Sequence, residues 1–449
     1  MAEQQYIDIF TQYKDVINSK SAEGINALRE KAFEVFKKNG LPTSKLEDYK
    51  YIAVDKLFAS DYGLNINRLP LKGNPYFAFR CEVENLSKNL FYMLNDMCNE
   101  AHIPDGDYPD GVFVGSLKTF AEINPNVFAQ YYGKIANVES NPQDIVAFNT
   151  MFAQDGFVVY VPDNIIVETP IQLINILKSD LDYLVNRRIL VIAGENSQVK
   201  LLACDHTVDN SRFLVTQVTE IYAGKNAVVD FYELEEDSTK VSRVSSLYAE
   251  QEEASNVLVN NITLQCGITR NNYRVKLNGE RAESYICGMV IADKEQYVDN
   301  FISMDHSVPN CHSTQLFKYI LQDKAKGAFC GRIVVEKDAQ KTLAYQSNNN
   351  LCISPDARMY SKPQLEIYAD DVKCSHGLTT GQLDEDAMFY LRARGISKQD
   401  ARLMLMQAFM ADVLSHVRID SLRHRLSELV EKRLRGDSSA RCGNCAVCK

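Results

Sequence analysis

The segment SNVLVNNITLQCGITRNNYRVKLNGERAESYICGMVIA, Ser255 to Ala292, consists of short β-branched runs separated by Asn and Gly. Similar runs fill residues 151–376, and turn residues recur there at roughly ten-residue spacing, which is typical of an all-β stack, sandwich or barrel. A single sandwich takes only about 100 residues. A β-helix, whose turns stack into a solenoid, fits the length better, although no hexapeptide or nonapeptide repeat is present. We therefore predict a mainly β chain with a β-helix core.

Asparagine runs accompany these strands at Asn260-Asn261, Asn271-Asn272 and Asn348 to Asn350. Such runs suit turns, or ladders of side-chain amides between successive turns of the solenoid.

The region 1–150 mixes helix and short strands. Apolar spacing predicts a helix from Ser21 to Lys38, ended by Gly40 and Pro42, and a second helix near 87–101. Nothing in this region has catalytic spacing, and the pair Glu47-Asp48 is most simply solvated surface.

The region 377–435 is predicted to be helical. Asp384 is a plausible N-cap and Gly395 a plausible stop, and Ser397 opens a second helix that is apolar nearly all round. Such a helix is buried in a core or docks on another chain, and four methionines nearby favour a contact surface. The last helix, Asp420 to Arg435, is rich in Arg and Glu and is predicted to be solvated. Residues 436–449 form a Cys-rich tail that we expect to be flexible.

Composition restricts the function classes. The chain has 449 residues, 45% of them hydrophobic, and a net charge of −10 without a Lys/Arg cluster, which argues against nucleic acid and anionic membrane as partners. No secretory signal and no apolar run of about 18 residues is visible, so we expect a cytoplasmic protein. In that compartment its 12 cysteines are expected to be thiols or metal ligands rather than disulfides.

The commonest enzyme signatures are missing from the sequence. It contains no P-loop, no Gly-x-Gly-x-x-Gly after a strand, no Gly-x-Ser-x-Gly and no His-Glu-x-x-His. Hydrolysis of ATP by a P-loop in this chain is therefore not expected.

The best local constellation is Cys374-Ser375-His376. It follows a strand-like run from Leu365 and precedes a predicted loop at Gly377 to Gly381. Thiolate and imidazole are natural ligands for iron or zinc, and a thiolate can also carry sulfur. The alternative is that both side chains only pack.

Three weaker candidates remain. His306 and His312 are predicted to be buried, hydrogen-bonded histidines rather than ligands. Asp370-Asp371 could act as a carboxylate pair on a polysaccharide, but adjacent strand residues point to opposite faces. The tail cysteines Cys442, Cys445 and Cys448 have metal-ligand spacing, yet a structural zinc needs four ligands; the alternative is a reactive, disordered end.

Longer stretches resemble the SufB/SufD family, scaffold subunits of the SUF machine for iron–sulfur cluster assembly. The resemblance rests on PQLEIYADDVKCSHG and GQLDEDAMFYLRARGIS around the Cys374–His376 junction, on nearly continuous similarity from Gly267 to Ser354, and on GLPTSKLEDYKY near the N-terminus. Cys374, Ser375, His376 and Gly377 match the SufD pattern, whereas Leu378 replaces the usual alanine. SufB-type chains carry a glutamate after the histidine, so the sequence is most like SufD.

The resemblance implies a right-handed parallel β-helix core flanked by N-terminal and C-terminal helical regions. It also implies a non-catalytic subunit that pairs with a SufB-type paralogue, binds the ABC-type ATPase SufC through its C-terminal helices, and works with a cysteine desulfurase and its sulfur relay protein. Iron or a nascent cluster would be held at the interface with the paralogue, where Cys374 and His376 correspond to candidate ligands, and some members bind reduced flavin adenine dinucleotide (FAD). A SufB-like or homodimeric scaffold, and a β-helical polysaccharide-acting enzyme, are the alternatives.

Overall fold

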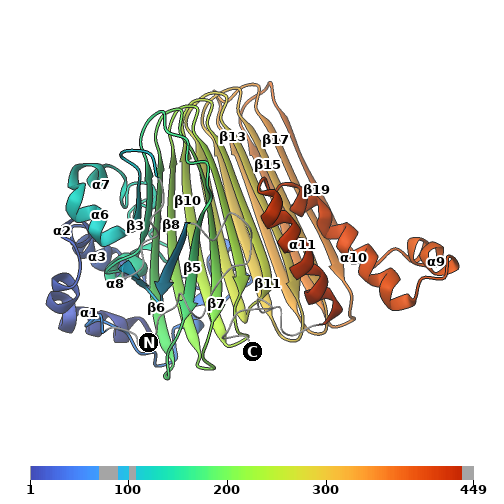
Figure 1. Cartoon of the computed structure of the whole chain (residues 1–449), viewed down its shortest axis with the longest axis horizontal. Helices are drawn as coiled ribbons and strands as arrows, with labels where there is room; N and C mark the ends of the chain where they lie inside the picture. Colours follow the sequence, from blue (N-terminus) through green and yellow to red (C-terminus); the bar gives the residue numbers. More distant parts are fainter. Residues whose placement is uncertain (1, 70–88, 101–107, 437–449) are drawn as a thin grey trace.

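The centre of the molecule is a parallel β-solenoid built from two stacked sheets (Figure 1). The computed structural model describes residues 2–69, 89–100 and 108–436. From β4 onward, successive strands alternate between the sheets, so each turn of the solenoid contributes one strand to each sheet. The prediction of a mainly β chain with a β-helix core is thus confirmed.

The two sheets are named here by their strand numbers. The odd sheet has the order β19-β17-β15-β13-β11-β9-β7-β5-β1-β2, and the even sheet β18-β16-β14-β12-β10-β8-β6-β4-β3. All neighbours are parallel except β1–β2 and β3–β4. The strand bounds are β1 Leu90–Leu94, β2 Met97–Cys98, β3 Phe113–Ser116, β4 Phe157–Val161, β5 Ile171–Leu177, β6 Tyr183–Ala193, β7 Gln198–Thr207, β8 Phe213–Ala223, β9 Val228–Glu236, β10 Val241–Gln251, β11 Asn256–Gln265, β12 Ile268–Leu277, β13 Glu283–Ala292, β14 Tyr297–His306, β15 His312–Leu321, β16 Lys326–Val335, β17 Leu343–Cys352, β18 Arg358–Ile367 and β19 Lys373–Gly381.

The repeat is about 30 residues long, which is why no short repeat is visible in the sequence. Asn186 of β6 lies beside Thr216 of β8, 30 positions later, and accepts a hydrogen bond from its hydroxyl.

Asparagine ladders occur both in the turns and inside the solenoid. Asn164, Asn196 and Asn226 occupy equivalent turns with φ of 62°, 55° and 56°, a conformation that Asn tolerates well. Their amides are linked in series, each Nδ2 donating to the Oδ1 of the preceding one at 2.8 Å. Asn271, predicted for such a ladder, donates to Asn300 of the next turn at 2.9 Å.

Helices cover the outer faces of both sheets. Those of the N-terminal region pack on the even sheet, and α10 and α11 pack on the odd sheet. The helical bounds are α1 Ala2–Ser19, α2 Glu23–Asn26, α3 Arg29–Asn39, η1 Glu47–Tyr49, α4 Val54–Leu57, α6 Leu117–Ile123, α7 Pro125–Tyr131, α8 Val146–Phe152, α9 Glu385–Ala393, α10 Lys398–Ser415 and α11 Asp420–Arg435. In the described residues, no helix combines the length and the apolar character needed to cross a membrane.

One prediction for the N-terminal region is wrong, and another is correct only in part: the helix predicted from Ser21 to Lys38 is present as two helices, with Gly40 at its end as predicted. The helix predicted near 87–101 is the hairpin β1–β2, because the apolar run Leu90–Leu94 pairs with β5 in the odd sheet. The predicted helix from Ser21 to Lys38 is broken between α2 and α3. After this break, the buried guanidinium of Arg29 reaches the carbonyl oxygen of Met151 at 2.8 Å.

The C-terminal region follows the predictions at its caps but differs in two elements. The side chain of Asp384 accepts hydrogen bonds at the start of α9, Gly395 follows that helix with φ of 86°, and Ser397 caps α10. The predicted loop at Gly377 to Gly381 is instead the end of β19, because these residues pair with β17. The predicted solvated helix α11 buries one apolar face against the odd sheet.

Candidate functional site

The two ends of the solenoid differ. At the N-terminal end, the antiparallel strands β2 and β3 close the sheets, and helices α6 and α7 cover the neighbouring even strands. At the other end, β18 and β19 are edge strands, and no described residue pairs with their outer sides. We call this the open end.

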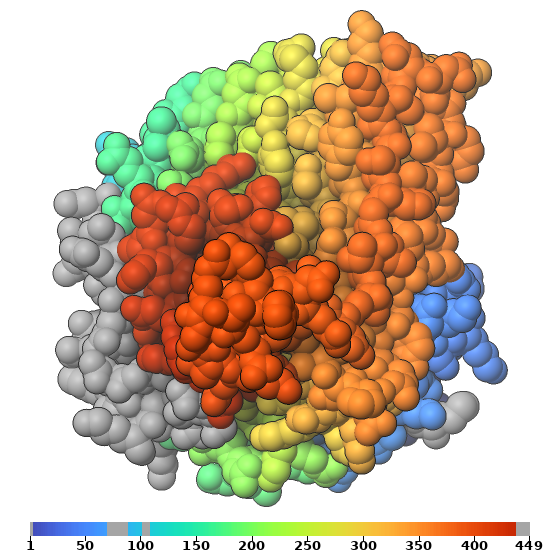
Figure 2. All heavy atoms as spheres, turned by 90° about the vertical axis from the view of Figure 1, so that its right-hand side faces the viewer, coloured from blue at the N-terminus to red at the C-terminus, as the bar shows by residue number. Residues whose placement is uncertain are grey.

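Helix α10 does not cap the open end. It runs back along the outer face of the odd sheet, where it contacts β13 and β15. Figure 2 looks onto this end of the molecule and shows the last strands exposed beside the C-terminal helices, with part of the N-terminal region next to them.

Cys374 lies on β19 with its side chain turned inward. It pairs with Ala344 of β17 and packs half-buried against the core between the sheets. Burial raises the pKa of the Cys374 thiol, and a hydrogen bond from the Ala344 N–H offsets only part of this effect. The thiol is therefore protonated at neutral pH in the isolated chain, and metal binding would have to displace the proton.

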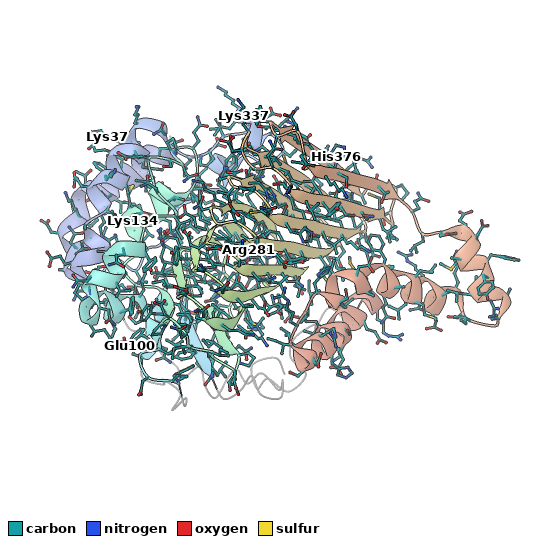
Figure 3. All side chains as sticks on the ribbon, turned by 90° about the horizontal axis from the view of Figure 1, so that it is seen from above. Lys37, Glu100, Lys134, Arg281, Lys337 and His376 are labelled. Carbon is teal, nitrogen blue, oxygen red and sulfur yellow. The ribbon has the colours of Figure 1, made fainter. Side chains whose placement is uncertain are left out.

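His376 lies two residues further along the same strand and pairs with Gln346 of β17. Alternate residues of a strand share a face and stand about 6.6 Å apart, so Cys374 and His376 face the same side. His376 is exposed because β19 is the last strand of its sheet. Figure 3 shows it at this end of the sheet stack, with Lys37 at the opposite end.

Exposed apolar side chains surround this pair. Leu378 on β19, Tyr360 and Ile367 on β18, and Tyr368 just beyond it are between 39% and 60% exposed. Tyr51 of the N-terminal region stacks on Tyr360 with ring centroids 5.0 Å apart. The open end therefore combines two unpaired strand edges, aromatic surface and two potential iron ligands.

The histidines His306 and His312 are not part of this site. His306 is fully buried in the core, its Nε2 lies 2.8 Å from the hydroxyl oxygen of Ser313, and burial lowers its pKa to about 4. The prediction of a buried, hydrogen-bonded residue is correct for His306, whereas His312 is only half-buried and its ring lies edge-on to Tyr285.

The remaining predicted site residues do not lie with Cys374 and His376. Asp370 and Asp371 lie in the exposed turn between β18 and β19, not in a strand as predicted. The tail cysteines Cys442, Cys445 and Cys448 lie outside the described residues. Among the described residues, no group of three or more His, Cys, Asp or Glu side chains is arranged to hold a metal. Cys374 and His376 could thus supply only part of a ligand set.

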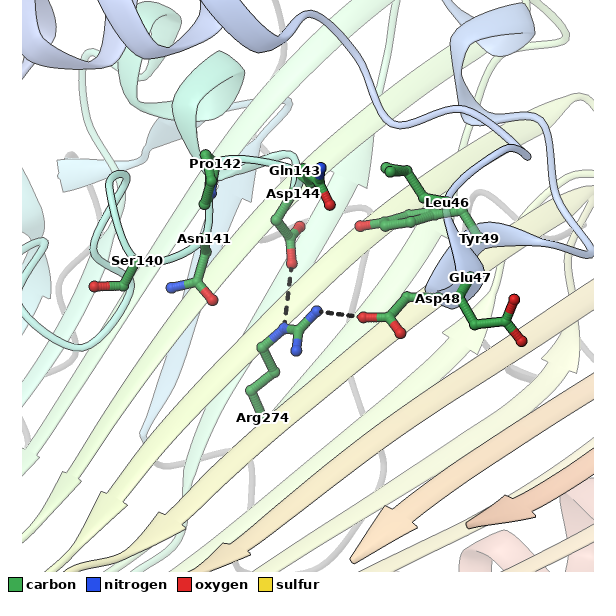
Figure 4. Close-up of a pocket in the computed structure, with 10 residues that line it drawn as sticks. All are labelled: Leu46, Glu47, Asp48, Tyr49, Ser140, Asn141, Pro142, Gln143, Asp144 and Arg274. Carbon is green, nitrogen blue, oxygen red and sulfur yellow. Dashed lines mark hydrogen bonds and ion pairs between the residues drawn. The ribbon is translucent and has the colours of Figure 1, made fainter. Parts of the chain in front are cut away.

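A polar cavity on the even sheet was missed by the sequence reasoning. Its volume is about 250 Å³, and Arg274 of β12 lies in it between two carboxylates, at 3.2 Å from Asp48 and 3.7 Å from Asp144 (Figure 4). Asp48 is therefore an anchor of the N-terminal region and not simply solvated surface. One sequence feature could have indicated this anchor. Asp48 and the buried Tyr49 belong to GLPTSKLEDYKY, one of the segments on which the family resemblance rests.

The fold and the open end define a class: a β-solenoid that presents two strand edges, with a cysteine and a histidine on one of them. The family models identify it further. The SufBD core domain of SUF system FeS cluster assembly matches residues 176–409, and the SufBD protein N-terminal region matches residues 1–173. The chain belongs to the SufBD family of the SUF system for iron–sulfur cluster assembly.

Named relatives agree with this family and include SufD proteins. A SufBD family protein of Synechocystis is 28% identical over 403 residues, which cover 88% of this chain and 87% of that protein. SufD of Escherichia coli is 40% identical over 169 residues, covering 38% of this chain and 40% of that protein. SufD of Bacillus subtilis is 24% identical over 361 residues, covering 79% and 81%. The predicted likeness to SufD is thereby confirmed.

Proposed function

We propose that this chain is a SufD-like scaffold subunit that pairs through its open end with a SufB-type paralogue and holds iron or a nascent cluster at the shared interface. The observation that carries the proposal is the uncapped pair of edge strands with Cys374 and His376 on one of them. Iron and the cluster are cargo of the assembly reaction. The partner would complete the ligand set that this chain supplies only in part.

Strand edges favour this mode of association. An exposed edge presents unpaired N–H and C=O groups, and soluble proteins usually cover or charge such edges to prevent unwanted pairing. Here β18 and β19 each present nine or ten residues of free edge. A second solenoid with a similar end could extend both sheets by main-chain hydrogen bonding, while the tyrosines around the edge supply apolar contact.

The ATPase SufC is the second proposed partner, and α9 is its proposed contact. This helix buries no residue in the chain, and Figure 1 shows it projecting away from the solenoid. Phe389 and Tyr390 are 75% and 57% exposed. Movement of docked ATPases could then open or close the interface if the complex has two states that bind nucleotide differently.

The desulfurase and its relay protein would supply sulfur to the assembled complex.

Reduced FAD is carried over from the family, and two cavities formed by described residues can be compared with it. The cavity at Arg274 and its neighbour of about 320 Å³ on the same sheet are small for a whole dinucleotide, and both are lined largely by charged and polar groups. An isoalloxazine ring needs a flat apolar slot. Neither cavity fits it, and we assign no step to a flavin.

The proposal is tested by co-expressing the chain with SufB-type and SufC-type subunits and measuring complex mass, iron and acid-labile sulfide after anaerobic reconstitution. His376→Ala should leave the complex intact and lower iron loading at least several-fold, because a cargo ligand is lost. His424→Ala is the matched control, since His424 is an exposed histidine on α11 away from the open end.

Wild-type iron loading in His376→Ala would reject the site. A chain that forms no complex with either subunit would reject the scaffold role, and a stable homodimer that loads iron would favour the homodimeric alternative.

A further inference from the structure

A column of side-chain amides leads to His376 from inside the solenoid. Gln315 of β15, Gln346 of β17 and His376 of β19 are register partners on successive strands of the odd sheet. Parallel neighbours stand about 4.8 Å apart, so their side chains lie next to each other on the inner face. Gln315 and Gln346 are buried, and only His376 is exposed, at the open end.

The hydrogen bonds fix the orientation of both amides. Gln315 Nε2 donates to the carbonyl oxygen of Arg332 at 3.4 Å, and because a carbonyl can only accept, the Gln315 oxygen must face the other way. That oxygen accepts from Gln346 Nε2 at 2.7 Å. Each amide therefore donates through its Nε2, Gln315 Oε1 accepts the bond from Gln346, and Gln346 Oε1 is the acceptor that takes part in neither bond.

Gln346 Oε1 is a buried acceptor without a hydrogen-bond partner, although Gln346 is only 3% exposed. Leaving such a group unsatisfied costs about 1–3 kcal/mol, so native proteins usually supply a donor. The next side chain in the column is the imidazole of His376, which carries an N–H in either neutral tautomer.

The opposite sheet leaves room for the amides. A Cβ at Gly331 of β16 would collide with Gln346 Nε2 and would lie 2.7 Å from Gln315 Oε1. Any larger residue at this position would displace the column. The space between the sheets is thus shaped for two stacked amides that end at the open end.

The structure places Gln346 and His376 side by side without a hydrogen bond between them. We propose that Gln346 is a positioning residue for His376: a turn of the exposed imidazole lets one ring N–H donate to the unpaired Oε1 of Gln346, which leaves the other ring nitrogen free to bind iron. This inference rests on the proposed function for its ligand, but the hydrogen bond itself concerns only this chain. Acceptors of this kind fix the tautomer and orientation of metal-binding histidines, and their loss typically lowers metal affinity 10–100-fold.

The test uses the full chain in complex with its SufB-type and SufC-type partners and Fe(II) alone as probe. Gln346→Leu should weaken Fe(II) binding about ten-fold. Asn348→Leu is the matched control: Asn348 is a buried amide two residues along the same strand, but its register partner is Leu378 rather than His376. It should bind Fe(II) like the wild type even where its melting temperature falls.

The second readout is the tautomer of His376, measured by nitrogen-15 NMR of histidine-labelled chain and assigned with His376→Ala. The wild type should show one tautomer, Asn348→Leu the same one, and Gln346→Leu a mixture. A purely structural role for Gln346 would not produce this change.

The outcomes separate this inference from the proposed function. If His376→Ala loses iron but Gln346→Leu binds it normally, the positioning role is wrong and the site stands. If His376→Ala keeps its iron, the site is wrong, and the tautomer spectra alone decide whether Gln346 orients the imidazole. Identical spectra for Gln346→Leu and the wild type would overturn the hydrogen bond.

Discussion

The interior of the solenoid contains charged side chains as well as apolar ones. Arg243 lies between the sheets within 2.7 Å of Glu233, and Arg187 within 2.8 Å of Asp205. Glu235 lies beside them and accepts a hydrogen bond from Thr263 at 3.0 Å. Burial, opposed in part by Arg243, raises the pKa of Glu235 to about 8. Ionised side chains without a full partner are costly in such a place.

The raised pKa of Glu235 predicts a pH-dependent stability. Below its unfolded pKa, near 4.5, Glu235 is protonated in both states, and as pH rises towards 8 only the unfolded chain gains from ionisation. Folding stability should therefore fall over this window, and Glu235→Gln should remove that part of the fall. We expect the stability of the variant relative to the wild type to rise between pH 5 and pH 8 by about 3–4 kcal/mol, because the two pKa values differ by more than this pH window. Urea unfolding at both values measures it.

Glu366→Gln is the matched control because Glu366 lies on the outward side of the edge strand β18. An equal advantage of Glu235→Gln at pH 5 and pH 8 would contradict the assigned titration and indicate a packing effect.

The sequence predicted Cys374 and His376 together because they are two residues apart on one strand. It could not predict Gln346 as their neighbour, because that placement depends on the pairing of strands 30 positions apart, and the spacing between paired strands varies along the solenoid, for example 26 positions between β10 and β12 and 31 between β15 and β17. A pattern within one strand is local, whereas register between turns is a property of the folded chain.

Among the described helices, α9 has the least support from the rest of the chain. None of its residues is buried, yet both ends are capped by residues predicted for that purpose, Asp384 and Gly395. A capped helix with two exposed aromatic rings is suited to contact another protein.

Phe389→Ser should therefore weaken binding of the ATPase without destabilising the chain. Loss of a central aromatic contact costs about 2 kcal/mol or more, equivalent to about a 30-fold loss of affinity. Titration of SufC-type ATPase by calorimetry measures the affinity, and thermal unfolding measures stability. Tyr13→Ser, at an exposed position of α1, is the control. Unchanged ATPase binding in Phe389→Ser would place the contact elsewhere.

Helix α11 and the end of β19 show where element prediction failed. The Arg and Glu content of α11 hides a stripe at Leu422, Leu426 and Leu429, whose helical spacing did indicate a buried face. The glycines and threonines at the end of β19 have weak strand preference. Pairing with β17 outweighs that preference, since β-propensity depends strongly on context.

At the scale of the whole molecule, the two ends of the solenoid differ in how their strands are covered. One end is closed by antiparallel strands and helices, and the other stops at two parallel edges. The N-terminal region reaches this second end along the even sheet: Glu47 forms an ion pair with Lys362 of β18, and Tyr51 stacks on Tyr360. The open end is thus held in shape by both halves of the chain, while no strand of the described ranges pairs with its outer edges.

The proposed assembly through those edges depends on the side chains that β19 presents at the open end. Leu378 is 43% exposed on β19, so Leu378→Lys should leave the melting temperature of the isolated chain nearly unchanged. In a complex, the same lysine would be buried at the interface without a partner, and charged side chains on edges are a common natural device against strand pairing. We expect its affinity for the SufB-type subunit to fall at least ten-fold, measured by analytical ultracentrifugation. Ile166→Lys, at an equally exposed turn far from the open end, should bind normally. Equal affinity of both variants would show that the subunits do not pair through β19.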